Sequence, residues 1–256
     1  MTCCSRHICA AILMLTAAVP AASAAGIDLA WNDCFVEGGT FNRSFACNTN
    51  SGSNTMVVSF NPPDGIGVVV GGTAVIDLIS ATSALPSWWL LGPGGCREGA
   101  LRLEFGTMSQ GCPDPWAGSA TGTYSYTVGP EGRSDVARIV VSWTVPDAQA
   151  VQLEPGWEYF AFRLVLDNVN TLGGGCSGCQ VPICIGLNAM CLHRAGGMST
   201  YPIYNPLNNN LITWQGGAIP GGCPGTDGPG PHFPPYDCLA TPVINRSWGH
   251  IKGLYR

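Results

Sequence analysis

The chain has 256 residues, of which 46% are hydrophobic and only 11% are charged, and its formal net charge at pH 7 is −5. Lys252 is the single lysine. Nucleic acids and anionic membrane surfaces are therefore excluded as partners, because both are recognised through clustered Lys and Arg. The 35 glycines and 20 prolines indicate many turns and few long helices.

The N-terminus has the pattern of a signal peptide spanning residues 1–25. Arg6 and His7 precede an apolar run from Ile8 to Val19, and Ala-Ser-Ala follows at residues 22–24, which suits signal peptidase. We therefore expect a secreted protein that is extracellular or at the cell surface. No later apolar stretch approaches the ~20 residues of a membrane helix, so no membrane span is expected.

Ten of the 13 cysteines remain once this segment is removed, an even number suited to disulfides in an oxidising compartment. They are Cys34, Cys47, Cys96, Cys112, Cys176, Cys179, Cys184, Cys191, Cys223 and Cys238. Short separations favour local pairs. The expected pairs are Cys34 with Cys47, Cys96 with Cys112, Cys223 with Cys238 and, within the CxxC cluster, Cys176 with Cys184. Zinc or redox chemistry at that single CxxC is the alternative.

Two segments alternate apolar and polar side chains with period two, which is typical of strands with one buried face. In Val136–Val145 the buried set is Ala137, Ile139, Val141, Trp143 and Val145. In Trp157–Asn168 it is Phe160, Phe162, Leu164 and Leu166. Further strands are expected at Gly26–Trp31, Thr55–Phe60, Thr73–Ser80, Leu101–Phe105, Thr121–Val128, Val181–Met190 and Leu211–Trp214.

Nine short strands without strand–helix alternation predict an all-β protein, an antiparallel β-sandwich of Ig-like or jelly-roll-like type with disulfide-stapled loops. Residues 26–256 are expected to form one domain. It would include a long Gly/Pro loop at 221–238 and a short C-terminal helix capped by Ser247.

Adjacent tryptophans at Trp88 and Trp89 offer a candidate binding surface. On a strand, one of the two would face solvent, where an indole can stack on a sugar ring or on a partner protein. Trp116, Tyr124 and Tyr126 could extend this platform. Packing within the core is the alternative for all five residues.

Three residues with oxygen-bearing side chains, Asp167, Asn168 and Asn170, lie at the end of the predicted strand Trp157–Asn168 or just after it. Such ligands on a loop can hold Ca²⁺, although the EF-hand spacing is absent and Asx-turn chemistry also explains them. No other cofactor is expected.

Catalytic motifs are missing from the sequence. It has no GxSxG elbow, no HExxH and no glycine-rich phosphate loop between a strand and a helix. Glu154 and Glu158 could form a glycosidase pair, and an extracellular hydrolase is the least favoured interpretation. We expect a non-enzymatic protein.

Several segments together resemble a group of secreted bacterial proteins to which no activity is attached. They are GIDLAW-NDC at residues 26–34, ALPSWW at 84–89, CSGCQVPIC at 176–184, TWQGGA at 213–218 and NRSWGHIKGLYR at 245–256. The resemblance implies a shared fold and transfers no catalytic residue. The pair YFAFRLVLDNVNT and VPICIGLNAMCL is similar to adjacent strands of cohesin-like and carbohydrate-binding β-sandwiches.

These observations favour a secreted, non-catalytic β-sandwich that binds a carbohydrate or an extracellular protein, or that serves in adhesion. The alternative is a structural subunit that self-assembles at the cell surface. Low charge and scarce lysine remove the repulsion and the edge-strand protection that keep β-proteins apart.

Overall fold

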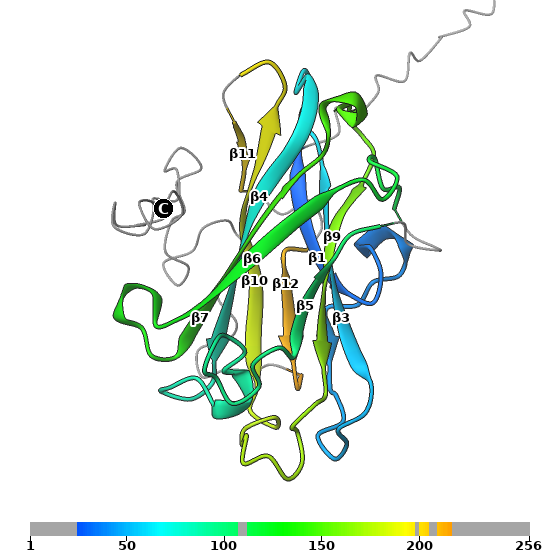
Figure 1. The fold of residues 1–256 in the computed structure, drawn as a ribbon. Helices are drawn as coiled ribbons and strands as arrows, with labels where there is room; N and C mark the ends of the chain where they lie inside the picture. Colours follow the sequence, from blue (N-terminus) through cyan, green and yellow to red (C-terminus); the bar gives the residue numbers. More distant parts are fainter. Residues whose placement is uncertain (1–24, 107–111, 198–199, 205–208, 217–256) are drawn as a thin grey trace, which may run out of the picture.

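In the computed structural model, which describes residues 25–106, 112–197, 200–204 and 209–216, two β-sheets face each other (Figure 1). The smaller sheet is antiparallel throughout, with strand order β1-β3-β9-β5. Its strands are β1 (Gly26–Trp31), β3 (Ser53–Asn61), β5 (Leu101–Glu104) and β9 (Tyr159–Asp167).

The larger sheet has the order β2-β12-β10-β4-β7-β6, with β11 added to β10 and β8 added to β4. All its pairs are antiparallel except β12 with β2. Its strands are β2 (Asn42–Arg43), β4 (Val68–Ser80), β6 (Thr121–Val128), β7 (Val136–Thr144), β8 (Val151–Gln152), β10 (Ile183–Arg194), β11 (Tyr201–Ile203) and β12 (Leu211–Trp214).

The predicted β-sandwich is confirmed. The described residues also contain four 3-10 helices: η1 (Phe35–Glu37), η2 (Ser87–Trp89), η3 (Pro130–Gly132) and η4 (Asp147–Gln149). None of the described helices is long and apolar enough to cross a membrane. The predicted signal peptide lies almost wholly outside the described residues, and the predicted loop at 221–238 and C-terminal helix lie entirely outside them.

Period two in the sequence correctly predicts the buried face of β7, where Ala137, Ile139, Val141 and Trp143 all enter the main core. In β9 all four residues of the predicted set are buried, but Phe160 does not share the face of Phe162, Leu164 and Leu166. A bulge shifts the register, so that Val58 opposes Phe162 while Ser59 opposes Phe160. One extra residue reverses the alternation. Phe160 therefore leaves the main core and packs with Val57 beside Cys34 and Cys112.

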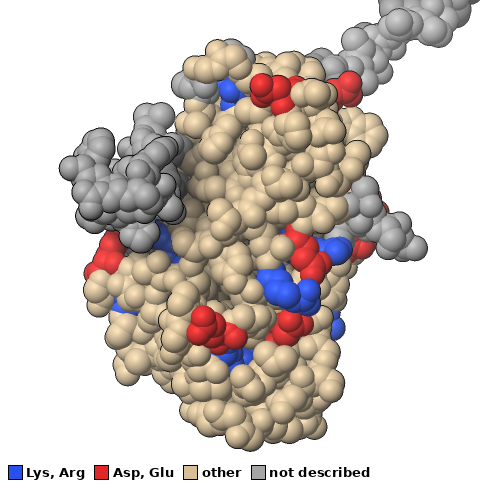
Figure 2. Space-filling view, viewed as in Figure 1, with Lys and Arg blue, Asp and Glu red and all other residues tan. Residues whose placement is uncertain are grey.

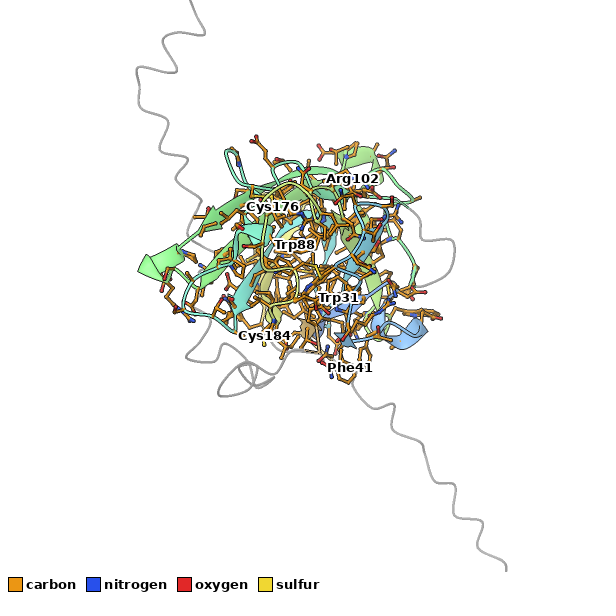
Figure 3. All side chains as sticks on the ribbon, turned by 90° about the horizontal axis from the view of Figure 1, so that it is seen from below. Trp31, Phe41, Trp88, Arg102, Cys176 and Cys184 are labelled. Atoms are coloured by element: carbon orange, nitrogen blue, oxygen red, sulfur yellow. A yellow bond between two sulfur atoms is a disulfide. The ribbon has the colours of Figure 1, made fainter. Side chains whose placement is uncertain are left out.

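Four of the tryptophans in the main core, Trp31, Trp88, Trp89 and Trp214, form one aromatic cluster, and Figure 3 shows Trp31 and Trp88 inside the sandwich. Trp214, at the end of β12, has its ring 4.8 Å from that of Trp88 and 5.3 Å from that of Trp89, and Phe45 stacks on it at 4.2 Å. Trp31 of β1 lies 6.1 Å away, so this aromatic cluster joins both sheets. The Trp214 indole N–H also donates to the Cys179 carbonyl at 2.7 Å.

Disulfides are confirmed, but the local pairing is wrong. The bonds join Cys34 to Cys112, Cys47 to Cys179 and Cys96 to Cys176, across separations of 78, 132 and 80 residues. The predicted pairs Cys34 with Cys47, Cys96 with Cys112, and Cys176 with Cys184 are therefore excluded. Sheet topology brings together loops that are distant in sequence, which separation alone does not reveal.

Cys184 and Cys191 are also disulfide-bonded. All eight described cysteines are thus oxidised, which leaves no thiolate pair at the CxxC for zinc or for redox chemistry in this state. The predicted Cys223–Cys238 pair lies outside the described residues.

We predict that Trp214→Ala lowers the free energy of unfolding by about 3–5 kcal/mol, because it empties the middle of the aromatic cluster. Trp214→Phe should cost less, since it keeps a ring and loses mainly the hydrogen bond to Cys179. Urea unfolding measures both, with exposed Trp157→Ala as the control. A Trp214→Ala loss no larger than that of the control would show that this cluster does not hold the sheets together.

Candidate functional site

The predicted tryptophan platform does not exist at Trp88 and Trp89. Pro86 precedes a 3-10 helix instead of a strand, and both indoles are fully buried with their rings 4.9 Å apart. Trp116 is also buried. Strand alternation predicted an exposed indole at Trp88 or Trp89, and neither is exposed, while Trp116 adds no exposed ring to a platform. The packing alternative applies to all three residues.

Arg97 is a fully buried cation that lies against the Trp88 ring. No pattern in the surrounding sequence predicts that this arginine is buried. Its guanidinium lies 3.5 Å from the centre of the Trp88 ring. Burial lowers the pKa of Arg97 to about 10, and the nearby charge of Asp167 opposes that change. A charge in this position is stabilised by the ring and by hydrogen-bond acceptors.

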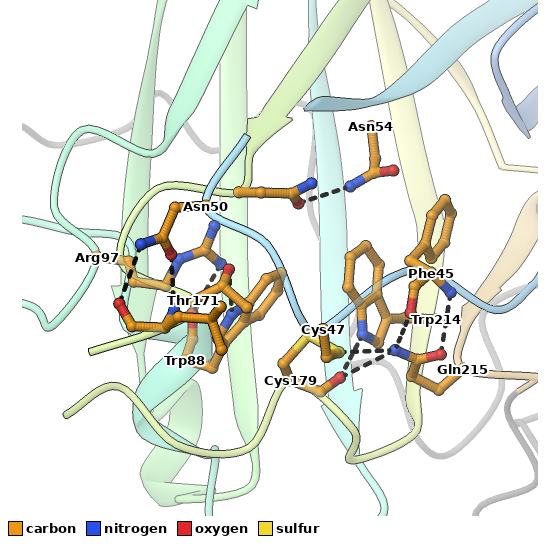
Figure 4. The surroundings of a disulfide bond; sticks show 12 residues. Phe45, Cys47, Asn50, Asn54, Trp88, Arg97, Thr171, Cys179, Trp214 and Gln215 are labelled. Atoms are coloured by element: carbon orange, nitrogen blue, oxygen red, sulfur yellow. Dashed lines mark hydrogen bonds between the residues drawn. A yellow bond between two sulfur atoms is a disulfide. The ribbon is translucent and has the colours of Figure 1, made fainter. Parts of the chain in front are cut away.

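Main-chain carbonyls supply those acceptors. Arg97 donates to the carbonyl oxygens of Trp88, Val169 and Asp167. The Cys96–Cys176 bond lies directly beside it in sequence. The loop between η2 and β5 is thereby held against the loop that follows β9, as Figure 4 shows for Arg97, Trp88 and their neighbours.

Tyr124 and Tyr126 are placed differently from the tryptophans. Both rings are half-buried on the edge strand β6, and both hydroxyls point inward. Tyr124 donates to the Leu101 carbonyl at 2.6 Å, and Tyr126 donates to the Trp89 carbonyl. Burial raises the pKa of both phenols, so they stay protonated and hold the rings in position at neutral pH.

These two rings line a cleft of about 500 Å³ at the corner of the sandwich, which we call the corner cleft. Its residues are Leu91, Gly92, Pro93, Glu98, Gly99, Tyr124, Ser125 and Tyr126. Gly92 lies against Tyr126, where the Cβ atom of any other residue would come within 3.2 Å of the ring. Glycine at this position therefore keeps the cleft open beside the aromatic wall.

The corner cleft offers aromatic faces and few charges. Glu98 is its only carboxylate, and one oxygen of that group accepts from the Gly94 N–H at 2.9 Å. No second acid and no histidine lines the cleft, so the described residues provide no acid–base pair in it.

Two of the three residues expected to hold calcium use their side chains in protein contacts. Both carboxylate oxygens of Asp167 accept from Arg102, at 2.9 and 3.1 Å. The Asn168 side chain bonds to Asn54 and to the Ser51 carbonyl. The Thr171 N–H donates to the Asn168 carbonyl, which is a turn contact. Asn170 has a φ of 58°, a left-handed value that Asn tolerates in turns.

One group of metal-ligating side chains is close enough to share an ion in the described parts of the chain: Cys34, Cys112 and Glu158. The two cysteines form a disulfide, which removes them as thiolate ligands. Glu158, half of the imagined glycosidase pair, is buried, whereas Glu154 is exposed.

Glu158 has a structural role in the described fold. Its carboxylate accepts from the main-chain N–H groups of Phe35 and Val36 and from the Ser59 hydroxyl. It therefore holds η1 against the smaller sheet. Burial raises the pKa of this carboxyl, the Ser59 hydrogen bond opposes the rise, and the nearby Asp28 adds to it.

Comparison with known proteins assigns no family to this chain. No protein-family model matches it, and no curated protein matches it in sequence. Among solved structures, a cohesin module from a Clostridium perfringens ATCC13124 family 33 glycoside hydrolase is similar at a TM-score of 0.34. Identity is 9%, over 75% of this chain and 93% of that one. The similarity is loose and bears on no motif and no ligand.

The raised pKa of Glu158 predicts a pH-dependent stability. The folded state binds the proton of the Glu158 carboxyl more tightly than the unfolded chain does. The stabilisation from this protonated carboxyl is therefore fully present below the ordinary glutamate pKa of about 4.3, and it declines as the pH rises through the pKa of Glu158 in the folded state. The unfolding free energy of the natural protein minus that of Glu158→Gln should therefore fall as the pH rises above about 4.3, the ordinary pKa of a glutamate. Ser59→Ala should extend the decline to higher pH. A difference that is flat with pH would contradict this.

Proposed function

We propose that this protein is a secreted, non-catalytic binding module that takes a neutral carbohydrate in the corner cleft. The observation that carries the proposal is the pair of tyrosine rings lining the cleft, each held by an inward hydrogen bond of its hydroxyl. Aromatic faces pack against the apolar faces of sugar rings. Rings fixed in advance lose little conformational freedom on binding, which favours affinity.

Charge supports a neutral ligand. The cleft contains Glu98 and no cation, and Figure 2 shows a face with few, scattered charged side chains. Removal of Arg6 with the signal peptide would take the formal charge from −5 to −6. Sulfated or carboxylated glycans would be repelled, whereas sugar hydroxyls can donate to the Glu98 carboxylate and exchange hydrogen bonds with Ser125.

The disulfides are the reason for placing the protein outside the cell. Bridges of this number persist in oxidising compartments, and the sequence has a predicted signal peptide in front of the fold. Secretion and adhesion remain parts of the proposal. A protein ligand is the alternative occupant, and binding assays with glycans separate the two.

We predict that the secreted protein binds neutral oligosaccharides on a glycan array. Tyr126→Ala should weaken this binding at least tenfold, because the substitution removes part of the aromatic wall of the cleft. Glu98→Ala, which changes an exposed side chain, should weaken it without loss of stability. Titration calorimetry with the best-retained oligosaccharide measures each change.

Trp157→Ala is the matched control for the loss of an exposed aromatic residue. Trp157 precedes β9, whereas the cleft lies near the other end of that strand, where Leu101 of β5 pairs with Leu166. Nine residues of strand separate the two ends by about 25 Å or more. Unchanged binding in both cleft variants, or retention of no neutral glycan, would rule out the proposal.

Self-association through β6 is the second candidate, and one observation favours it. This eight-residue edge strand, TGTYSYTV, carries no charge and no proline, and its residues are largely exposed. Within the described chain, only β7 pairs with it. Such an edge can accept a strand from another copy.

If this edge pairs, light scattering after size exclusion should show a mass that rises with concentration. Thr123→Lys with Thr127→Lys should restore the monomer, because both exposed positions then carry charge along the paired edge. A monomer at every concentration in the natural protein would eliminate self-association.

A further inference from the structure

The free edge of β6 lies beside the corner cleft. β6 is the last strand of the larger sheet, and among the described strands only β7 pairs with it. Tyr124, Ser125 and Tyr126, in the middle of this strand, line the cleft. In an antiparallel pair, the main-chain N–H and C=O groups of successive residues point alternately toward the paired strand and away from it. The residues of β6 that point away from β7 therefore present these groups to the open edge.

Hydrogen bonds at the two ends of β7 show which residues these are. The Gly129 N–H donates to the Val136 carbonyl, and this pair continues the β6–β7 register. On its other side, β7 bonds to β4, where the Val145 N–H donates to the Val70 carbonyl in the β4–β7 register. Neither register is shifted along β7. Even-numbered residues of β7 therefore bond toward β6, and odd-numbered residues bond toward β4.

The same alternation places the main chain of Tyr124 at the open edge. Thr123 and Ser125 are paired with even-numbered residues of β7, so their main-chain groups bond to that strand. The main-chain groups of Tyr124 and Tyr126 point away from it. Within the described parts of the chain, no main-chain hydrogen bond outside the strand ladders reaches the N–H or the C=O of Tyr124.

Tyr124 is more open than Tyr126. Gly92 lies against the main chain of Tyr126, since a Cβ atom added to Gly92 would be 3.4 Å from the Tyr126 carbonyl oxygen. Tyr124 lines the same cleft, and its ring is held inward by the hydrogen bond from its hydroxyl to the Leu101 carbonyl. Tyr124 thus offers one main-chain donor and one main-chain acceptor, both fixed by the strand, beside the aromatic wall of the cleft.

A donor and an acceptor from one extended residue match two neighbouring hydroxyl groups. Standard bond lengths and β dihedrals place the nitrogen and the oxygen of such a residue about 3 Å apart, on the same side of the strand. Hydroxyl oxygens on adjacent carbons of a sugar ring have a similar separation when they are gauche to each other. One hydroxyl can accept from the Tyr124 N–H while its neighbour donates to the Tyr124 carbonyl, because each hydroxyl is both a donor and an acceptor.

We infer that the corner cleft selects neutral sugars with two free, gauche hydroxyls on adjacent ring carbons, and that the main chain of Tyr124 binds this pair. The inference rests on the proposed carbohydrate function and adds the feature of the sugar that is recognised. A sugar in which either hydroxyl is missing or substituted leaves a main-chain group unpaired inside the cleft, which costs affinity. A trans-diaxial pair is also excluded, because its oxygens are too far apart.

Hydrogen exchange measured by NMR on the secreted protein tests the role of Tyr124. The probes are trans-cyclohexane-1,2-diol, whose hydroxyls are adjacent and equatorial, and trans-cyclohexane-1,4-diol, whose hydroxyls are on opposite ring carbons. The 1,2-diol should slow exchange of the Tyr124 amide about twofold or more once its concentration reaches the dissociation constant, whereas the 1,4-diol should not. The amides of Thr123 and Ser125 are internal controls, because they already bond to β7.

Two variants separate the main chain of Tyr124 from its ring. Tyr124→Ala removes the ring, and Tyr124→Pro removes both the ring and the N–H. Proline breaks no ladder hydrogen bond here, because this N–H points away from β7, which is the setting in which edge strands accept proline. The proline variant should bind the 1,2-diol about fivefold more weakly than the alanine variant, as expected for one lost hydrogen bond. Equal affinities would contradict the role of the N–H.

The outcomes distinguish this inference from the proposed function. If neutral glycans bind and Tyr126→Ala weakens them, but both diols leave the Tyr124 amide unchanged, the selection of adjacent hydroxyls is overturned and the carbohydrate function stands. If no neutral glycan binds and neither diol slows exchange, both are overturned. Exchange at Tyr124 that slows with rising protein concentration, without any diol, would show that a second copy occupies the edge of β6 and would also overturn the inference.

Discussion

The contact between Trp214 and its aromatic neighbours is the interaction on which the rest of the structure depends. Trp214 comes from the larger sheet, Trp31 from the smaller one, and Trp88 and Trp89 from the helix between β4 and β5. Each buried indole contributes a large apolar area, and edge-to-face contacts add about 0.5–1.5 kcal/mol per pair. Phe45 and the Cys47–Cys179 bond close the cluster on one side (Figure 4).

This cluster also shapes the corner cleft. The Trp89 carbonyl accepts the Tyr126 hydroxyl, and the Leu90 carbonyl accepts the Arg97 N–H. Arg97 in turn lies over the Trp88 ring. The aromatic wall of the cleft is thus attached to the most deeply packed part of the core, which explains how tyrosine rings at the edge of a sheet are held in fixed positions.

Local pattern predicted the strands well because one face of each strand meets the core. The bounds of β6 and β12 agree with the sequence, and β7 has the buried face expected from period two. Tyr124 and Tyr126, which the sequence offers as candidate site residues, line the corner cleft, and their role in binding stays a prediction. Trp88 and Trp89 were misplaced because Pro86 begins a 3-10 helix there, and Phe160 because a bulge reverses its side. Such events depend on tertiary contacts that periodicity does not contain.

The disulfides show why loop length could not predict their pairing. Closing a loop costs entropy only as the logarithm of its length, so the 132-residue Cys47–Cys179 loop is not much harder to close than a local one. Pairing is decided by which loops the sheets bring together. Cys96–Cys176 joins the loop that lines the corner cleft to the loop after β9, where Arg97 already binds the Val169 carbonyl. Reduction would leave Arg97 and the aromatic contacts to hold the cleft alone, so an oxidising environment stabilises the very loops that form the candidate binding site.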